Sequence, residues 1–260
     1  MKRISALALL LAFGVSTTQA AELSASVRFT NLAFSASDLT PGDGVAPFYE
    51  LLPSEHWKST TSVYRDQPAF FDNDNVVPFL GDASVATTFI DGATARAQVT
   101  SNSVESQAAG PANSTYLLQA SGNLVGSFYA PLIRIAPGTR LTFSGNAELL
   151  ASATCPNECY ALALLEFDFG YYGEEGSYTK TLMTSLAAPS QSFTAPVSLS
   201  YANTSTEDQY LGLVVHADVE LSNTAVPEPA TWALVLGGGL VALGFGRHRR
   251  RKDWQNPALD

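Results

Sequence analysis

The feature that most constrains this chain is an alternation of apolar and polar side chains with a period of two. It is clearest near the end of the chain, where the odd-numbered positions from 211 to 221 hold only Leu, Val or Ala. The even-numbered positions include His216, Asp218 and Glu220. Because successive side chains of a strand point to opposite faces of a sheet, this segment is predicted to be a strand with one buried and one solvated face.

Similar runs, separated by Gly, Pro, Asn, Asp and Ser, recur along the chain and predict an all-β fold. We expect an antiparallel β-sandwich over residues 22–222 that resembles a jelly roll or an immunoglobulin fold. The expected strands are Leu23–Phe34, Val85–Val99, Ser114–Ala120, Leu124–Ile135, Arg140–Ser152, Tyr160–Tyr172, Tyr178–Leu186, Ser192–Tyr201 and Tyr210–Leu221. The less regular stretch from Thr40 to Asp82 is expected to form long loops over one end, where a site would lie.

The charge distribution excludes one class of partner. Residues 22–224 carry 21 acidic side chains against seven basic ones, and five further basic residues lie in a short cluster from Arg247 to Lys252. A protein that binds nucleic acid needs a basic surface on its folded part to neutralise phosphates. An acidic body with a basic tail is therefore not expected to bind nucleic acid.

The N-terminus has the three parts of a secretory signal peptide. Lys2 and Arg3 precede an apolar run from Ile4 to Val15, and small residues at Thr18 and Ala20 suit the −3 and −1 positions of a cleavage site. We expect residues 1–21 to be removed on export and the mature chain to begin near Ala21 or Glu22. A short membrane anchor is the alternative, although the run is short for a spanning helix.

Export changes how the two cysteines are interpreted. Cys155 and Cys159 are separated by three intervening residues and lie between two expected strands. Outside the cytoplasm such pairs tend to oxidise, so we expect a disulfide at the tip of a hairpin. A redox pair or half of a metal site is the alternative, but redox motifs usually have two intervening residues and no second Cys or His pair completes a zinc site.

The C-terminus combines an apolar segment with a basic cluster. Ala230 to Gly246 carries no charge and reaches the lower limit, about 17 residues, for a transmembrane helix. The cluster that follows at once is retained on the cytoplasmic side, which would put the body outside. Its basic residues are Arg247, Arg249, Arg250, Arg251 and Lys252. The helix would anchor the body at the inner membrane, and residues 253–260 would form a short cytoplasmic tail.

Val226-Pro227-Glu228-Pro229, followed by the apolar segment and the arginine cluster, resembles the PEP-CTERM sorting signal of bacteria that make exopolysaccharide. The resemblance covers residues 223–252. It implies that Pro227, Glu228 and Pro229 are recognised by an exosortase, a membrane cysteine protease, and that the basic cluster acts as the stop signal. It also implies delivery of the body to the cell envelope, surface or extracellular matrix.

Three polar groupings in the body are candidates for chemistry. His216, Asp218 and Glu220 share a strand face and suit a metal or a polar pair with a neighbouring strand. Glu166 and Asp168 also share a face, at a separation that fits an inverting glycosidase pair. Asp72 and Asp74 supply the oxygen ligands that calcium prefers, but lack the glycine and distant Glu of an EF-hand loop. Each grouping is also explained by a solvated surface.

These observations predict a non-enzymatic, exported surface protein that works without a cofactor or resident metal. The expected partners are an exosortase during sorting and exopolysaccharide, as in a biofilm, or other surface proteins afterwards. The alternative is a surface glycan hydrolase, or a glycan-binding module that uses aromatic side chains such as Tyr49, Trp57 and Tyr64 against sugar rings.

Overall fold

A computed structural model describes residues 22–53, 58–66, 70–78, 80–112, 114–125, 133–155, 159–171 and 176–223. All of them belong to a single unit that extends from residue 1 to residue 224. The described residues form fourteen strands and no helix, so the predicted all-β class is confirmed. The predicted signal peptide and all of the predicted sorting region after Asn223 lie outside these ranges.

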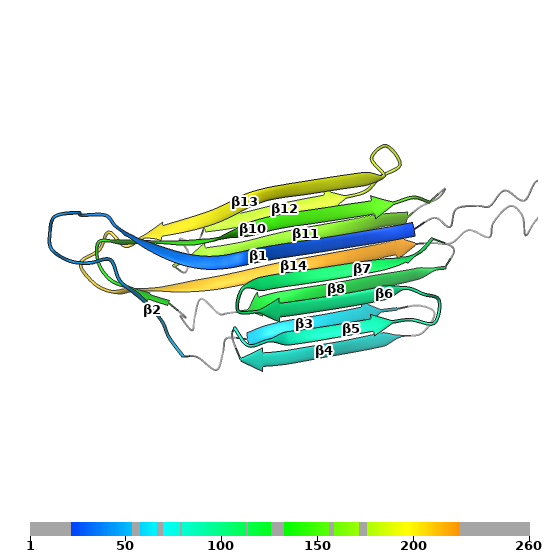
Figure 1. Cartoon of the computed structure of the whole chain (residues 1–260), viewed down its shortest axis with the longest axis horizontal. Helices are drawn as coiled ribbons and strands as arrows, with labels where there is room; N and C mark the ends of the chain where they lie inside the picture. Colours follow the sequence, from blue (N-terminus) through cyan, green and yellow to red (C-terminus); the bar gives the residue numbers. More distant parts are fainter. Residues whose placement is uncertain are drawn as a thin grey trace, which may run out of the picture. The chain divides into compact units, whose positions relative to one another are not determined.

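The strands form two sheets in which all neighbouring strands run antiparallel (Figure 1). The six-stranded sheet has the order β13 (Ser190–Ala202), β10 (Thr139–Ala153), β1 (Glu22–Asp38), β7 (Ser103–Pro111), β6 (Thr94–Thr100) and β5 (Ala83–Thr88). The eight-stranded sheet has the order β12 (Gly176–Met183), β11 (Cys159–Gly170), β14 (Gln209–Asn223), β8 (Tyr116–Val125), β3 (Lys58–Arg65) and β4 (Phe71–Pro78). Two short strands, β2 (Tyr49–Leu51) and β9 (Ile133–Ile135), extend it through the start of β14.

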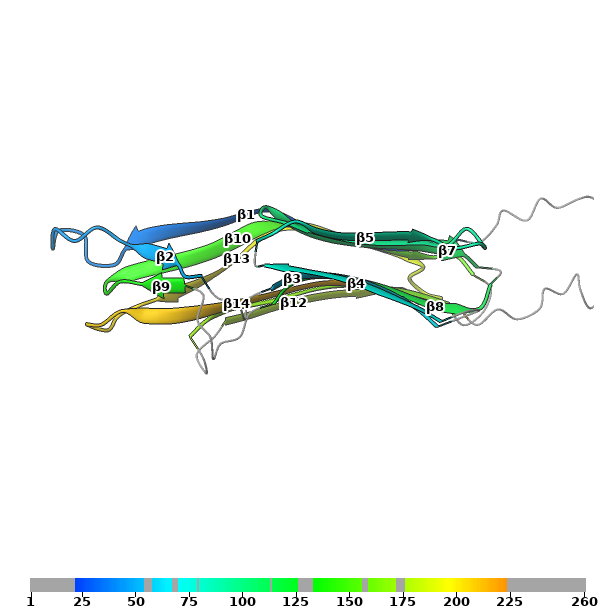
Figure 2. The same ribbon diagram turned by 90° about the horizontal axis from the view of Figure 1, so that it is seen from below.

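The two sheets lie face to face as layers of a sandwich (Figure 2). Strands that follow one another along the chain repeatedly face one another across the layers, as β7 and β8, β10 and β11, and β12 and β13 do. The hairpin predicted around the two cysteines is therefore wrong. The strand β10 pairs with β1 and β13, whereas β11 pairs with β12 and β14, so the short cysteine segment connects the two sheets.

The apolar faces of the two sheets enclose one core. The alternation of β14 is confirmed, because its six odd-numbered residues from 211 to 221 are at most 1% exposed. Aromatic rings join the layers: Phe29 of β1 stacks on Phe167 of β11 with ring centroids 5.2 Å apart. Gly145 of β10 makes room for this contact, since a Cβ atom there would lie 2.4 Å from the Phe29 ring. Burial of such rings is the main source of stability in a sandwich.

The prediction that Thr40 to Asp82 forms loops is wrong for its second half, which contains β3 and β4. The inward face of β3 carries Ser59, Thr61, Val63 and Arg65, so only one of its four buried positions is apolar. The side chain of Arg65 is 2% exposed, and its guanidinium forms an ion pair with Asp91, in the turn between β5 and β6. This ion pair connects the two sheets within the core.

The outermost strands β12 and β13 carry features that discourage further pairing. Lys180 of β12 lies opposite the buried Leu165 and so points toward the interior, where its Nζ lies 4.6 Å from the Phe193 ring centroid. Pro196 lies within β13, which pairs on one side only. Inward-pointing charges and prolines are typical of sheet edges, because neither favours a new strand neighbour.

Candidate functional site

The outward face of the eight-stranded sheet collects polar side chains from four neighbouring strands. In one row across the sheet, His216 of β14 lies between Glu166 of β11 and Asn123 of β8, and Asn123 lies opposite Thr60 of β3. In the next row, Asp218 lies opposite Ser121. All of these side chains are partly buried by their neighbours. We call the set Thr60, Gln119, Ser121, Asn123, Tyr160, His216, Asp218 and Glu220 the polar ladder.

Asn123 is the centre of the polar ladder. Its Oδ1 atom lies 2.8 Å from Nδ1 of His216, so in this arrangement the imidazole donates from Nδ1. Its Nδ2 atom donates to the hydroxyl of Ser121 at 2.9 Å and to that of Thr60 at 3.4 Å. Ser121 in turn donates its hydroxyl proton to Asp218. One amide thus connects three strands through side chains alone.

Asp218 has an environment unlike that of a surface carboxylate. Burial raises its pKa, and this effect is opposed by the hydrogen bond from Ser121 and by the charge of His216. Desolvation disfavours the ionised form of a carboxyl group, whereas a hydrogen bond donated to that form stabilises it. The prediction that His216, Asp218 and Glu220 share one face is confirmed. Their side chains do not converge on one position where a metal could bind, because each forms hydrogen bonds with residues of β8 or β11.

Glu220 forms the other end of the polar ladder. Its carboxylate accepts hydrogen bonds from Nε2 of Gln119, at 2.5 Å, and from the hydroxyl of Tyr160. The bond to Glu220 raises the pKa of Tyr160 to about 12, because the phenol must keep its proton to donate it. Both oxygens of Glu220 therefore have protein partners.

The two carboxylates proposed for a glycosidase lie on the outward face of the single strand β11. Glu166 faces Thr179 of β12 on one side and His216 on the other, and Asp168 accepts a hydrogen bond from Ser177. Glycosidase carboxylates instead flank a bound sugar from two sides, and the acid needs an apolar pocket to raise its pKa. The geometry of Glu166 and Asp168 gives the hydrolase interpretation no support.

The candidate calcium ligands lie on an edge strand and not in a loop. Asp72 and Asp74 are exposed on β4, opposite Tyr64 and Ser62 of β3. A calcium site needs six to eight oxygen ligands that converge on one point. Over the ranges that the structure describes, no group of three or more His, Cys, Asp or Glu side chains is arranged to hold a metal ion.

The aromatic side chains proposed for sugar binding do not form one surface. Tyr64 lies on the outward face of β3, with its ring 5.5 Å from that of Phe70 and edge-on to it. Tyr49 lies on β2 and packs against Phe34 at 6.0 Å. Trp57 lies outside the described residues. Tyr160, which the sequence interpretation did not select, is the aromatic residue that joins the polar ladder.

Sequence reasoning selected the β14 residues of the polar ladder but not those of β8. A break was expected between Ala120 and Leu124, whereas the structure has one continuous strand from Tyr116 to Val125. Gln119, Ser121 and Asn123 alternate there with the buried Leu118, Ala120 and Leu124. This alternation is the signal that would have identified them.

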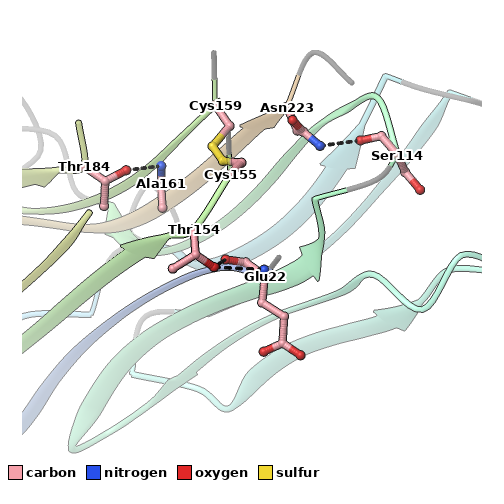
Figure 3. The surroundings of a disulfide bond; sticks show 8 residues. All are labelled: Glu22, Ser114, Thr154, Cys155, Cys159, Ala161, Thr184 and Asn223. Carbon is pink, nitrogen blue, oxygen red and sulfur yellow. Dashed lines mark hydrogen bonds between the residues drawn. A yellow bond between two sulfur atoms is a disulfide. The ribbon is translucent and has the colours of Figure 1, made fainter. Parts of the chain in front are cut away.

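The cysteine pair closes one end of the sandwich (Figure 3). The sulfur atoms of Cys155 and Cys159 lie at bonding distance, as expected for a disulfide. Beside them, the Thr154 side chain hydrogen-bonds the backbone of Glu22 at the start of β1, and Asn223 at the end of β14 donates to the carbonyl of Ser114. The disulfide therefore lies where the folded body begins and ends.

Pro227, Glu228, Pro229, the apolar segment 230–246 and the basic residues 247–252 lie outside the described residues. Within the described ranges, no helix has the length and hydropathy needed to span a membrane. Comparison with protein families, with curated proteins and with solved structures finds no match to this chain.

Proposed function

We propose that the chain is an exported, non-catalytic protein of the cell surface or extracellular matrix, sorted by a PEP-CTERM and exosortase system. The order of elements at the C-terminus carries this proposal. The last strand of the all-β body ends at Asn223, and in sequence V-P-E-P, an uncharged apolar segment and an arginine cluster follow within thirty residues. In sequence, Pro227 and Pro229 disfavour a helix in the recognition segment, which suits a protease substrate.

The chemistry of the body supports an address outside the cytoplasm. A disulfide persists in oxidising compartments and is rare where glutathione keeps thiols reduced. The signal-peptide pattern of residues 1–21 and the acidic body are consistent with that address. The finer fold assignment, a jelly-roll or immunoglobulin-like sandwich, remains part of this proposal. After sorting, the body would associate with exopolysaccharide or other surface proteins, as in a biofilm.

The sorting proposal is tested by the mass of the exported protein. In wild-type cells we expect a species that lacks the apolar segment and the basic cluster, whereas cells without exosortase should retain both. Replacing Pro227, Glu228 and Pro229 by Ala should preserve the longer species in wild-type cells. A matched control, Glu207→Gln in an exposed loop of the body, should be processed normally. Equal masses in both strains would refute cleavage.

A second candidate function, glycan binding, is favoured by the polar ladder. Flat arrays of hydroxyl, amide and carboxylate groups can exchange hydrogen bonds with sugar hydroxyls, and the neighbouring Tyr64 and Tyr160 offer ring faces or edges. Binding of the full chain to immobilised bacterial polysaccharides should weaken in Asn123→Ala and in Tyr64→Ala. Gln107→Ala, on the outward face of the other sheet, is the control. Equal loss in all three variants would argue against the polar ladder.

A further inference from the structure

Three apolar side chains project from one end of the sandwich. Of the large hydrophobic residues that the structure describes, the most exposed are Ile90, Leu186 and Phe70, at 102%, 84% and 71%. They belong to three separate connections, which join β5 to β6, β12 to β13 and β3 to β4. Leu186 lies at the edge formed by β12 and β13, and Ile90 and Phe70 lie toward the opposite edge formed by β4 and β5. A single exposed apolar residue is ordinary, but three that project from the same end can contact one flat surface together. We call these three residues the apolar tips.

The pairing of the strands places all three tips at the end of the body where the chain enters and leaves. The strand β1 begins at Glu22 and β14 ends at Asn223, beside the start of β11. Phe70 precedes β4, whose first residue Phe71 lies opposite Arg65 at the end of β3. In Figure 1 the turn from β5 to β6 and the connection from β12 to β13 lie at this same end.

Two of the tips are held in ordered turns. Ile90 lies in the hairpin closed by the bond from Phe89 N to Ala93 O, at 2.8 Å, and the adjacent Asp91 is fixed by Arg65. Leu186 lies between Ser185 and Ala188, whose backbones exchange two hydrogen bonds of 3.0 Å. The hydrogen-bonded backbone of each turn therefore holds Ile90 and Leu186 in exposed positions. Ordered apolar groups lose little conformational entropy when they contact a partner.

The charges of these connections indicate how they would bind. In sequence, residues 66–70, 89–93 and 184–189 contain no Lys or Arg and two carboxylates, Asp66 and Asp91. Asp66 accepts a hydrogen bond from the Leu117 backbone, and Asp91 is paired with Arg65. Attraction to anionic lipid or to an acidic partner is thus not the basis of the interaction. Apolar contact is the interaction that this surface offers.

The length of the chain beyond the body identifies the occupant. Seven residue steps separate Asn223 from Ala230, where the apolar segment begins, and an extended chain covers about 24 Å in that distance. If the segment from 230 to 246 is membrane-embedded, as the proposed function holds, the end that carries the apolar tips stays close to the bilayer. Such a tether gives even a weak contact an effective concentration on the order of millimolar.

We propose that the apolar tips insert into the lipid headgroup region while the chain is still attached to its C-terminal segment. This inference rests on the proposed function, because it requires the membrane anchor. The tips act as a second, weak contact that fixes which end of the sandwich faces the bilayer. Because three side chains bind only weakly without the tether, cleavage at the Pro-Glu-Pro segment releases the whole body.

The experiment uses the full chain in vesicles of phosphatidylethanolamine and phosphatidylglycerol. Single-cysteine variants Ile90→Cys and Leu186→Cys carry an environment-sensitive fluorophore, while the native Cys155 and Cys159 remain oxidised. Val45→Cys, at an exposed position in the loop that follows β1, is the control. We expect a blue shift of emission and quenching by spin-labelled lipid at positions 90 and 186, and neither effect at position 45. High salt should not abolish the shift.

Each result decides between the proposals. If the chain floats with the vesicles and all three labels behave alike, the docking is wrong and the anchor stands. If the chain does not float with the vesicles, the membrane anchor is refuted, and the docking, which requires the anchor, is refuted with it. A shift without lipid that grows with protein concentration would reveal contact with a second copy and overturn the inference. In an Ile90→Ser and Leu186→Ser double variant, a label at Phe70→Cys should lose its blue shift, while thermal unfolding stays unchanged.

Discussion

Arg65 on β3 and Asp91 in the turn from β5 to β6 form a two-point ion pair between the sheets, with N–O distances of 2.9 and 2.6 Å. The guanidinium carbon also lies 4.4 Å from the centroid of the Phe89 ring. A planar guanidinium matches a carboxylate in this geometry, and the ring face adds a cation–π contact. The pair fixes a turn of one sheet to the last residue of a strand in the other.

Breaking this pair should destabilise the body. Asp91→Asn leaves the Arg65 charge in the core without its counter-charge, and loss of one partner of a buried pair costs about 3–5 kcal/mol. Urea unfolding followed by circular dichroism measures the loss. The control is Arg28→Met, whose side chain is 53% exposed and whose surface ion pairs should contribute less than about 1 kcal/mol. Equal effects of the two variants would contradict a structural role for the pair.

The same pair predicts how stability depends on pH. The hydrogen bonds and charge of Arg65 hold the pKa of Asp91 below its usual 3.8, against the opposing effect of burial. A carboxyl whose pKa is lowered by folding adds stability above its unfolded pKa, and that stability is lost as pH falls through the folded value. The difference in unfolding free energy between the wild type and Asp91→Asn should therefore shrink below pH 3.8. Parallel pH curves would argue against it.

The disulfide should make a modest contribution because it closes a very short loop. On the chain-entropy model, Cys155–Cys159 stabilises the body by about 2 kcal/mol, and the double variant Cys155→Ser and Cys159→Ser should lose that amount. Thiol labelling of the unreduced, unfolded wild type should fail. Labelling at either cysteine under these conditions would reject the bond, and equal stability with and without reductant would reject its energetic role.

Gly145 should not tolerate even a methyl group. A Cβ atom there would lie 2.4 Å from the Phe29 ring, so Gly145→Ala forces the ring out of its stack with Phe167. Overpacking of this kind costs about 1–3 kcal/mol. Gly176→Ala is the matched control, because its nearest neighbour, Leu199, would lie at an ordinary 3.4 Å. Thermal unfolding should separate the two variants, and a neutral Gly145→Ala would show that the core adapts.

The alternation of side chains was enough to predict the fold class but not every strand. The odd-numbered residues from 211 to 221 are all apolar, and the structure has a strand over Gln209–Asn223. The strand β3 lacks this signal, because its inward positions are mostly Ser, Thr and Arg. Arg65 is stabilised there by its ion pair with Asp91, and Asp91 is brought to it by the tertiary fold. Local sequence does not contain that information.

Two connections between strands were predicted wrongly from the sequence, and the two errors have different causes. The expected strand from Val85 to Val99 is a hairpin, β5 and β6, and the Asp91-Gly92 pair in its turn is a known hairpin signal that could have identified it. The expected cysteine hairpin could not have been corrected in this way. A short loop suits a hairpin and a crossing between layers equally well, and the choice depends on β1 and β13, which pair with β10 from distant parts of the chain.

The inward Lys180 and the edge Pro196 have a consequence for a protein that would accumulate at high density. A matrix component made of sheets risks growing into fibrils when the open edge of one molecule accepts a strand from the next. Addition of a strand beside β12 would surround the Lys180 ammonium with apolar side chains, and β13 lacks an amide proton at Pro196. The β12 and β13 edges are thereby hindered from joining a second molecule when many copies are crowded together.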